Sequence, residues 1–89
     1  MKAHIYIYTK EEGGRMTAIF NNYRPSIWFE GDIVAHDAFL HTEEIMLKGG
    51  NSYFVELSFL YPDLVKEKLK AKYFTMREGQ KIVAKGELL

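Results

Sequence analysis

Residues 52–61 read SYFVELSFLY and form the longest segment of the chain with a strand-like composition. Val, Tyr and Phe are enriched in β-strands, and successive side chains of a strand point to opposite faces. The segment therefore predicts one long strand with a single apolar face. The residues expected on that face are Tyr53, Val55, Leu57, Phe59 and Tyr61.

Shorter segments with the same two-residue alternation lie on either side of this strand, separated by Gly, Asn, Pro or Asp. In the first of them, Ala3, Ile5 and Ile7 share one face. The other expected strands cover residues 17–20, 26–30, 33–40, 72–77 and 81–88. Residues 62–69 begin with proline and predict one or two helical turns. About seven short strands with regular turns predict an all-β fold, as a closed barrel or a sandwich.

The chain has 89 residues, which is enough for one domain with a modest core, and we expect residues 1–89 to form a single domain. It contains no cysteine, which excludes disulfides, thiolate catalysis and cysteine-based zinc sites. Its apolar runs are much shorter than the ~20 residues of a membrane-spanning helix, and its N-terminus lacks the apolar stretch of a secretory signal. We therefore expect a cytoplasmic protein without membrane contact.

Twelve basic side chains balance twelve acidic ones, so the formal net charge is zero. This balance argues against a protein that holds nucleic acid by phosphate neutralisation alone. Basic residues nevertheless gather in the C-terminal third, chiefly Lys66, Lys68, Lys70 and Lys72. We interpret this run as a solvated face; a surface that contacts phosphate groups is the alternative.

The sequence offers little support for catalysis. It contains neither a P-loop nor a G-x-G-x-x-G motif, so we expect no nucleotide site. His36, Asp37 and His41, with Asp32 nearby, are residue types that bind metals, but their spacing matches no ligand motif, and we interpret the histidines as surface residues. The serines lack the sequence context of a hydrolase nucleophile. We therefore predict a protein that is not an enzyme and holds no cofactor.

The segment KEEGGR at residues 10–15 predicts a tight loop. We expect Gly13 and Gly14 to supply the positive φ angles that such a reversal needs. Thr9 and Glu12 match the capping box of a helix N-terminus. Because the glycine pair follows at once, we interpret this match as coincidental.

KEEGGR at residues 10–15, NYRP at 22–25 and REG at 77–79 together resemble the C-terminal β-barrel, domain III, of bacterial elongation factor Tu. The resemblance runs in register over about residues 3–89, with further matching stretches at 20–26 and 48–51. It implies an antiparallel, roughly six-stranded, Greek-key-like barrel. It also implies a stand-alone homologue of that domain, without the GTPase domain and therefore without GTPase activity.

The resemblance further implies a site, because domain III in that family contacts the T-stem backbone of aminoacyl-tRNA. The positions carried over are Ser26, Arg77, Glu78 and Gly79. A glycine turn can bring backbone N–H groups close to phosphate oxygens, and Arg77 can add charge. The alternative is purely structural: Glu78-Gly79 is a hairpin turn, and Tyr23-Arg24-Pro25 is a packed corner in which Arg24 binds carbonyl groups.

The chain departs from the family pattern at positions where the family has His, Gly, Gln and Gly; these are Met16, Asn22, Ser26 and Gln80. The turns are retained while the contact positions change. We therefore predict a non-catalytic binding module that acts through protein or translation-machinery contacts. The alternative is an RNA-binding module that holds a tRNA stem through Arg77–Gly79 and the 66–72 segment.

Aromatic residues are abundant, with six Tyr, six Phe and one Trp. A barrel without its usual companion domains must make the uncovered faces polar or cover them with a partner, since large exposed apolar patches mark interaction sites. We therefore expect a protein partner or a homodimer.

Overall fold

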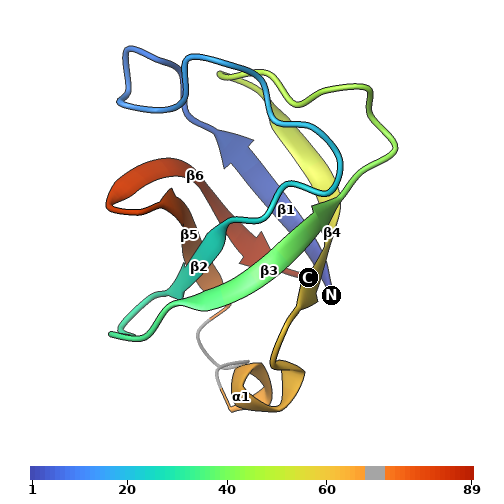
Figure 1. The fold of residues 1–89 in the computed structure, drawn as a ribbon, viewed down its shortest axis with the longest axis vertical. Coiled ribbons are helices and arrows are strands. Elements are labelled where there is room, and N and C mark those ends of the chain that lie inside the picture. The colour runs from blue at the N-terminus through green and yellow to red at the C-terminus, as the bar shows by residue number, and fades with distance from the viewer. Residues whose placement is uncertain (68–71) are drawn as a thin grey trace.

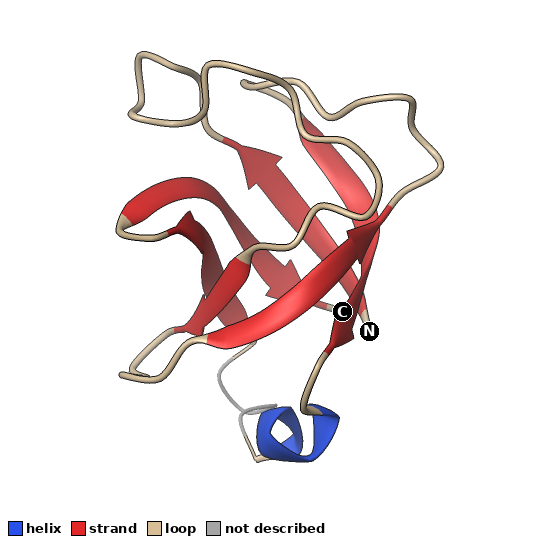
Figure 2. Ribbon diagram, in the orientation of Figure 1, coloured by secondary structure: helices blue, strands red, loops and turns tan. Residues whose placement is uncertain are grey.

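The computed structural model describes residues 1–67 and 72–89, and within them six strands close into an antiparallel barrel (Figures 1 and 2). The elements in chain order are β1 (Lys2–Ile7), β2 (Ser26–Phe29), β3 (His36–His41), β4 (Ser52–Phe59), α1 (Pro62–Lys66), β5 (Tyr73–Glu78) and β6 (Lys81–Leu88). Around the barrel their order is β1-β4-β3-β2-β5-β6. The predicted all-β, six-stranded antiparallel barrel is confirmed.

The alternating residues of the strands fill the barrel interior. Val55 and Leu57 of β4 are buried, and Tyr53 and Phe59 pack partly buried against the core. Tyr61 was expected on the same face, but it is 67% exposed, because β4 ends at Phe59 and the chain turns into α1. The buried residues of β1 are Ala3, Ile5 and Ile7, as the alternation predicts.

Long loops rather than a further strand cover one end of the barrel, at the top of Figure 1. The strand expected at residues 17–20 is reduced to one bridge, in which Ile19 and Leu47 exchange backbone hydrogen bonds of 2.9 and 2.7 Å. Both side chains are fully buried, so they belong to the core. The pairing stops there because the chain turns at Asn21-Asn22, where Asn22 has a φ of 69°.

The start of β3 also differs from the prediction. β3 begins at His36 rather than at residue 33, because Asp32 accepts hydrogen bonds from the backbone N–H groups of Ile33 (2.8 Å) and Val34 (3.2 Å) and holds residues 31–35 as a turn. The predicted helical turn exists as α1, and its Val65 side chain packs into the core. Lys68 and Lys70 of the basic run, and the expected end of the helical turn at residue 69, lie outside the described residues.

None of the helical structure within residues 1–67 and 72–89 is long and apolar enough to cross a membrane.

Candidate functional site

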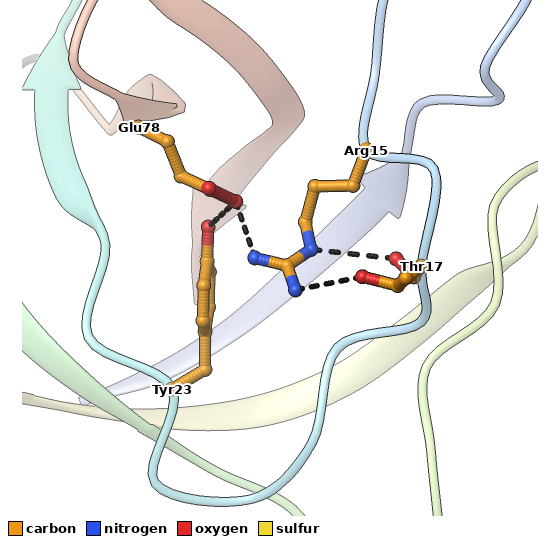
Figure 3. Close-up of polar contacts among 4 residues, drawn as sticks. All are labelled: Arg15, Thr17, Tyr23 and Glu78. Carbon is orange, nitrogen blue, oxygen red and sulfur yellow. Dashed lines mark hydrogen bonds and ion pairs between the residues drawn. The ribbon is translucent and has the colours of Figure 1, made fainter.

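Side chains from two N-terminal loops and from the end of β5 meet at one corner of the barrel (Figure 3). Arg15 forms an ion pair through Nη1 with Oε1 of Glu78, and the hydroxyl of Tyr23 donates a hydrogen bond of 2.6 Å to the same oxygen. Arg15 also donates to Thr17, to its backbone oxygen at 3.3 Å and to its hydroxyl at 3.0 Å. We call Arg15, Tyr23 and Glu78 the Glu78 corner. It joins the KEEGGR, NYRP and REG segments singled out from the sequence.

The ionisation states within the Glu78 corner follow from these contacts. Burial raises the pKa of Glu78, but hydrogen bonds from Tyr23 and Arg15 and the positive charge of Arg15 outweigh burial, so this pKa lies below its ordinary value. Burial, followed by the hydrogen bond to Glu78, raises the pKa of the Tyr23 hydroxyl. At neutral pH, Glu78 is therefore an ionised acceptor and Tyr23 a neutral donor.

We expect Glu78→Gln to lower the free energy of unfolding at neutral pH by about 0.5–1 kcal/mol, a modest value because the Glu78 side chain is 39% exposed and solvent screens its ion pair. The native pKa of Glu78 is depressed, so its stabilising effect is present above the unfolded-state pKa and is lost as the pH falls through the native value. Urea unfolding of both proteins at neutral and acid pH should show their difference shrinking in acid. The exposed Glu43→Gln serves as the matched control, and a Glu78→Gln difference that is constant with pH would contradict this role.

Arg77 and Ser26 lie beside the corner on neighbouring strands. They are register partners across β5 and β2. The Arg77 guanidinium stacks 4.6 Å from the ring centre of Trp28, and its Nε donates to the Thr75 hydroxyl at 3.2 Å. The Ser26 hydroxyl donates to a carboxylate oxygen of Asp37 at 3.3 Å. Each side chain is thus already engaged within the barrel.

Arg24, in the loop just before β2, is engaged in a similar way. Its Nη2 lies 3.3 Å from a carboxylate oxygen of Asp37, and its guanidinium stacks 5.6 Å from the ring centre of Phe39. The expectation that Arg24 binds carbonyl groups is wrong, because the outward-facing Asp37 of β3 offers a charged acceptor. Pro25 is fully buried beside it.

The four positions carried over for RNA contact lie in one region, but they differ in orientation and in the contacts they make. Ser26 and Arg77 face the outside of the barrel together. Glu78 directs its carboxylate to Arg15 and Tyr23. Gly79, in the β5–β6 turn, has a φ of 58° and open space where a side chain would lie. Sequence reasoning missed Arg15, and its place at the end of the KEEGGR turn was the available indication.

The loop before Arg15 overturns one interpretation. Thr9 and Glu12 do bond reciprocally: the Thr9 N–H donates to Oε1 of Glu12 at 2.9 Å, and the Glu12 N–H donates to the Thr9 hydroxyl at 3.2 Å. The reciprocal bonds of a capping box are therefore formed, although no helix follows them. A single turn of backbone is enough for this exchange, and the chain leaves that turn at Gly13, which has a φ of 92°.

His36 is not the surface residue that was expected. Its exposed fraction is 7%, its Nε2 lies 3.3 Å from a carboxylate oxygen of Asp32, and its ring centre is 5.7 Å from that of Phe29. His36 faces the barrel interior because it shares the inward face of β3 with Ala38 and Leu40. Within residues 1–67 and 72–89, no group of three or more His, Asp or Glu side chains is placed to hold a metal ion.

A comparison with known protein families gives one match over the entire chain. The model described as "Elongation factor Tu C-terminal domain" matches residues 1–89. The match includes all three segments of the Glu78 corner, and it confirms the resemblance that the sequence motifs indicate.

Proposed function

The chain belongs to the elongation factor Tu C-terminal domain family, a family of translation-related, non-catalytic domains, and from this we propose that it is a binding module acting through protein contacts. In this proposal residues 1–89 form a single domain that works in the cytoplasm, and the Glu78 corner and the arginines beside it are its docking surface. That surface carries three guanidinium groups, those of Arg15, Arg24 and Arg77.

The charge balance of this surface supports a protein partner. Arg15 is paired with Glu78, Arg24 is paired with Asp37, and Arg77 is stacked on Trp28. Phosphate binding depends on cations that replace the counterions of the nucleic acid. Cations already matched by carboxylates of the same domain supply less of that driving force. The pairing of Arg15 and Arg24 with carboxylates of the same domain is the observation that carries the proposal.

The apolar residues near the corner support the same conclusion. Met16 follows Arg15 and is 77% exposed, Phe39 lies under Arg24, and the backbone oxygen of Phe20 accepts a hydrogen bond of 3.2 Å from the Tyr23 N–H. Methionine, arginine and aromatic residues are the types enriched at protein interfaces. Together they offer a partner both apolar contact area and fixed donors.

Co-sedimentation with purified ribosomes, over a series of salt concentrations, tests this function. We expect the bound fraction of the wild type to fall little with added salt. We expect Phe39→Ala to bind ribosomes with about fivefold lower affinity, since truncating an interface aromatic costs at least about 1 kcal/mol. Phe54→Ala, an exposed aromatic on β4, is the matched control. Binding that is equally strong in the wild type and in Phe39→Ala, and that falls steeply with added salt, contradicts the proposal. So does an absence of binding combined with a strictly monomeric chain at high concentration in sedimentation equilibrium.

The alternative function is contact with a tRNA stem. It is favoured by the side-by-side placement of Ser26 and Arg77 next to the Gly79 turn. Lys66 and Lys72 of the basic run lie within the described residues, and Lys72 is directed toward Glu87, with 4.0 Å between Nζ and the carboxylate. This pairing weakens the phosphate-binding interpretation of the run.

A further inference from the structure

A second surface, on the outside of β1, β4 and the end of β3, carries an open groove of about 700 Å³. In the barrel β4 lies between β1 and β3 (Figure 1). Phe54 of β4 lines the groove, and its ring centre is 4.6 Å from that of His4 on β1. His4 therefore supports the Phe54 ring on the β1 side. Phe54 is nevertheless 73% exposed, so it offers a partner a large aromatic surface.

Charged side chains of opposite sign line the groove on the two sides of Phe54. Lys2 lies on the β1 side, and Glu43 and Glu44, which follow β3, lie on the other. In the part of the chain that the structure describes, none of these three charged side chains forms an ion pair. All three are exposed. We call Lys2, Glu43, Glu44 and Phe54 the Phe54 face.

Two other polar side chains of the groove are already engaged. The Glu56 carboxylate lies 2.9 Å from the Met1 amine, and the His41 ring is hydrogen-bonded to the Ser58 hydroxyl at 3.1 Å. The charges left without a partner are therefore of both signs. A phosphate group would meet the unpaired carboxylates, and a strongly basic peptide would meet the unpaired lysine. A surface with the same mixture of charges, in the opposite order, complements both.

We propose that the Phe54 face is the contact between two copies of this chain, related by a two-fold axis that passes close to Phe54. A two-fold contact uses the same patch on both copies, so the patch must complement itself. The axis exchanges the two sides of Phe54, and it therefore brings Lys2 of each copy to Glu43 and Glu44 of the other. The two Phe54 rings meet at the centre, where aromatic pairs stack favourably. The formal net charge of zero leaves no overall repulsion between the copies.

This contact does not involve the docking surface around the Glu78 corner. Phe39 of that surface is the register partner of Ser58, which lies four residues from Phe54 along β4, or roughly 13 Å. The Phe54 face is also small, so we expect a weak dimer with a dissociation constant of roughly 10–100 µM. At concentrations well below this value the chain is monomeric, and Phe54→Ala remains a valid control for ribosome co-sedimentation.

Sedimentation equilibrium of the chain, over about 5–500 µM to span the expected dissociation constant, tests this inference. We expect a monomer–dimer equilibrium in the wild type and a loss of about tenfold in affinity in Phe54→Ala. Lys2→Glu and the double variant Glu43→Lys/Glu44→Lys should each dimerise about tenfold more weakly, because like charges then face each other. An equimolar mixture of these two charge-reversed chains should dimerise like the wild type, since every contact again joins opposite charges.

Two variants outside both surfaces serve as controls. Tyr73→Ala removes an exposed aromatic residue from β5, which does not adjoin β4 in the barrel. Lys10→Glu reverses an exposed charge in the KEEGGR loop. Both should dimerise like the wild type, and circular dichroism should show that every variant is folded.

Three results would overturn the proposal. The first is a wild type that stays monomeric over the whole concentration range; if that monomer binds labelled oligolysine and Glu43→Lys/Glu44→Lys does not, the groove belongs to a basic partner segment. The second is a dimer that Phe54→Ala and both charge reversals leave unchanged, which would place the contact on another surface. The third is a mixture of the two charge-reversed chains that fails to dimerise, which would show that Lys2 does not meet Glu43 and Glu44 across a two-fold axis.

Discussion

Leu40→Ala should lower the free energy of unfolding by about 3 kcal/mol, the largest effect that we expect from a single substitution in this barrel. Leu40 is fully buried on β3 opposite Leu57 of β4, and its loss would leave a cavity that the closed barrel can collapse only in part. The Leu40 backbone also bonds to the loop of the Glu78 corner, donating to the Tyr23 oxygen at 2.8 Å and accepting from the Asn22 N–H at 2.8 Å. Equilibrium unfolding in urea measures the change.

The matched control for this prediction is the next residue along β3. Phe39 points outward and is 37% exposed, so Phe39→Ala should cost less than about 1 kcal/mol although it removes more atoms. If Leu40→Ala costs no more than Phe39→Ala, the inward and outward faces of β3 are assigned wrongly, and with them the register of the barrel.

Gly14→Ala should be nearly as damaging, at about 2–3 kcal/mol, because it introduces atoms where the backbone leaves no room. A Cβ atom at Gly14 would lie 2.5 Å from the carbonyl oxygen of Tyr8 and 2.9 Å from that of Thr9. The chain cannot relax without breaking the 2.9 Å hydrogen bond from the Gly14 N–H to the Thr9 oxygen. Thermal or urea unfolding would detect the loss, and Arg15 would be displaced from Glu78 with it.

Gly13→Ala separates the effect of space from that of backbone conformation. Gly13 has a φ of 92° and open space around it, so an alanine there would be strained but would not clash, at a cost of about 1 kcal/mol. The sequence led us to expect positive φ at both glycines, whereas the structure gives that conformation only to Gly13. Equal costs for the two substitutions would contradict the steric role of Gly14.

Much of the fold could be predicted because its determinants are local. The alternation of Ala3, Ile5 and Ile7 and the pattern of residues 52–61 fix which faces are inward, and the loop motifs carry the family resemblance. The expected strand at residues 17–20 fails because strand composition does not show whether a partner strand is available. Ile19 finds one partner, Leu47, in a loop that closes the barrel end.

The candidate sites were less predictable because their contacts join distant parts of the chain. Arg15 and Glu78 are 63 residues apart, and no local pattern indicates that they pair. The register of β1, β6 and β5 likewise brings Tyr6 and Tyr73, which are far apart in sequence, to one face of the barrel. His36 was misread because it shares the inward face of β3 with Ala38 and Leu40, and the pairing of β3 with β2 and β4 decides which face is inward.

The measurement that tests the central claim most directly is a fluorescence-anisotropy titration of labelled aminoacyl-tRNA at low salt, with the wild-type chain and with Arg77→Ala. If this surface serves protein contact, with the charges of Arg15 and Arg24 matched by Glu78 and Asp37, neither protein should show saturable binding, even at low salt where phosphate contacts are strongest. Saturable micromolar binding by the wild type that Arg77→Ala abolishes would contradict this account and make the region around Arg77 an RNA-binding surface.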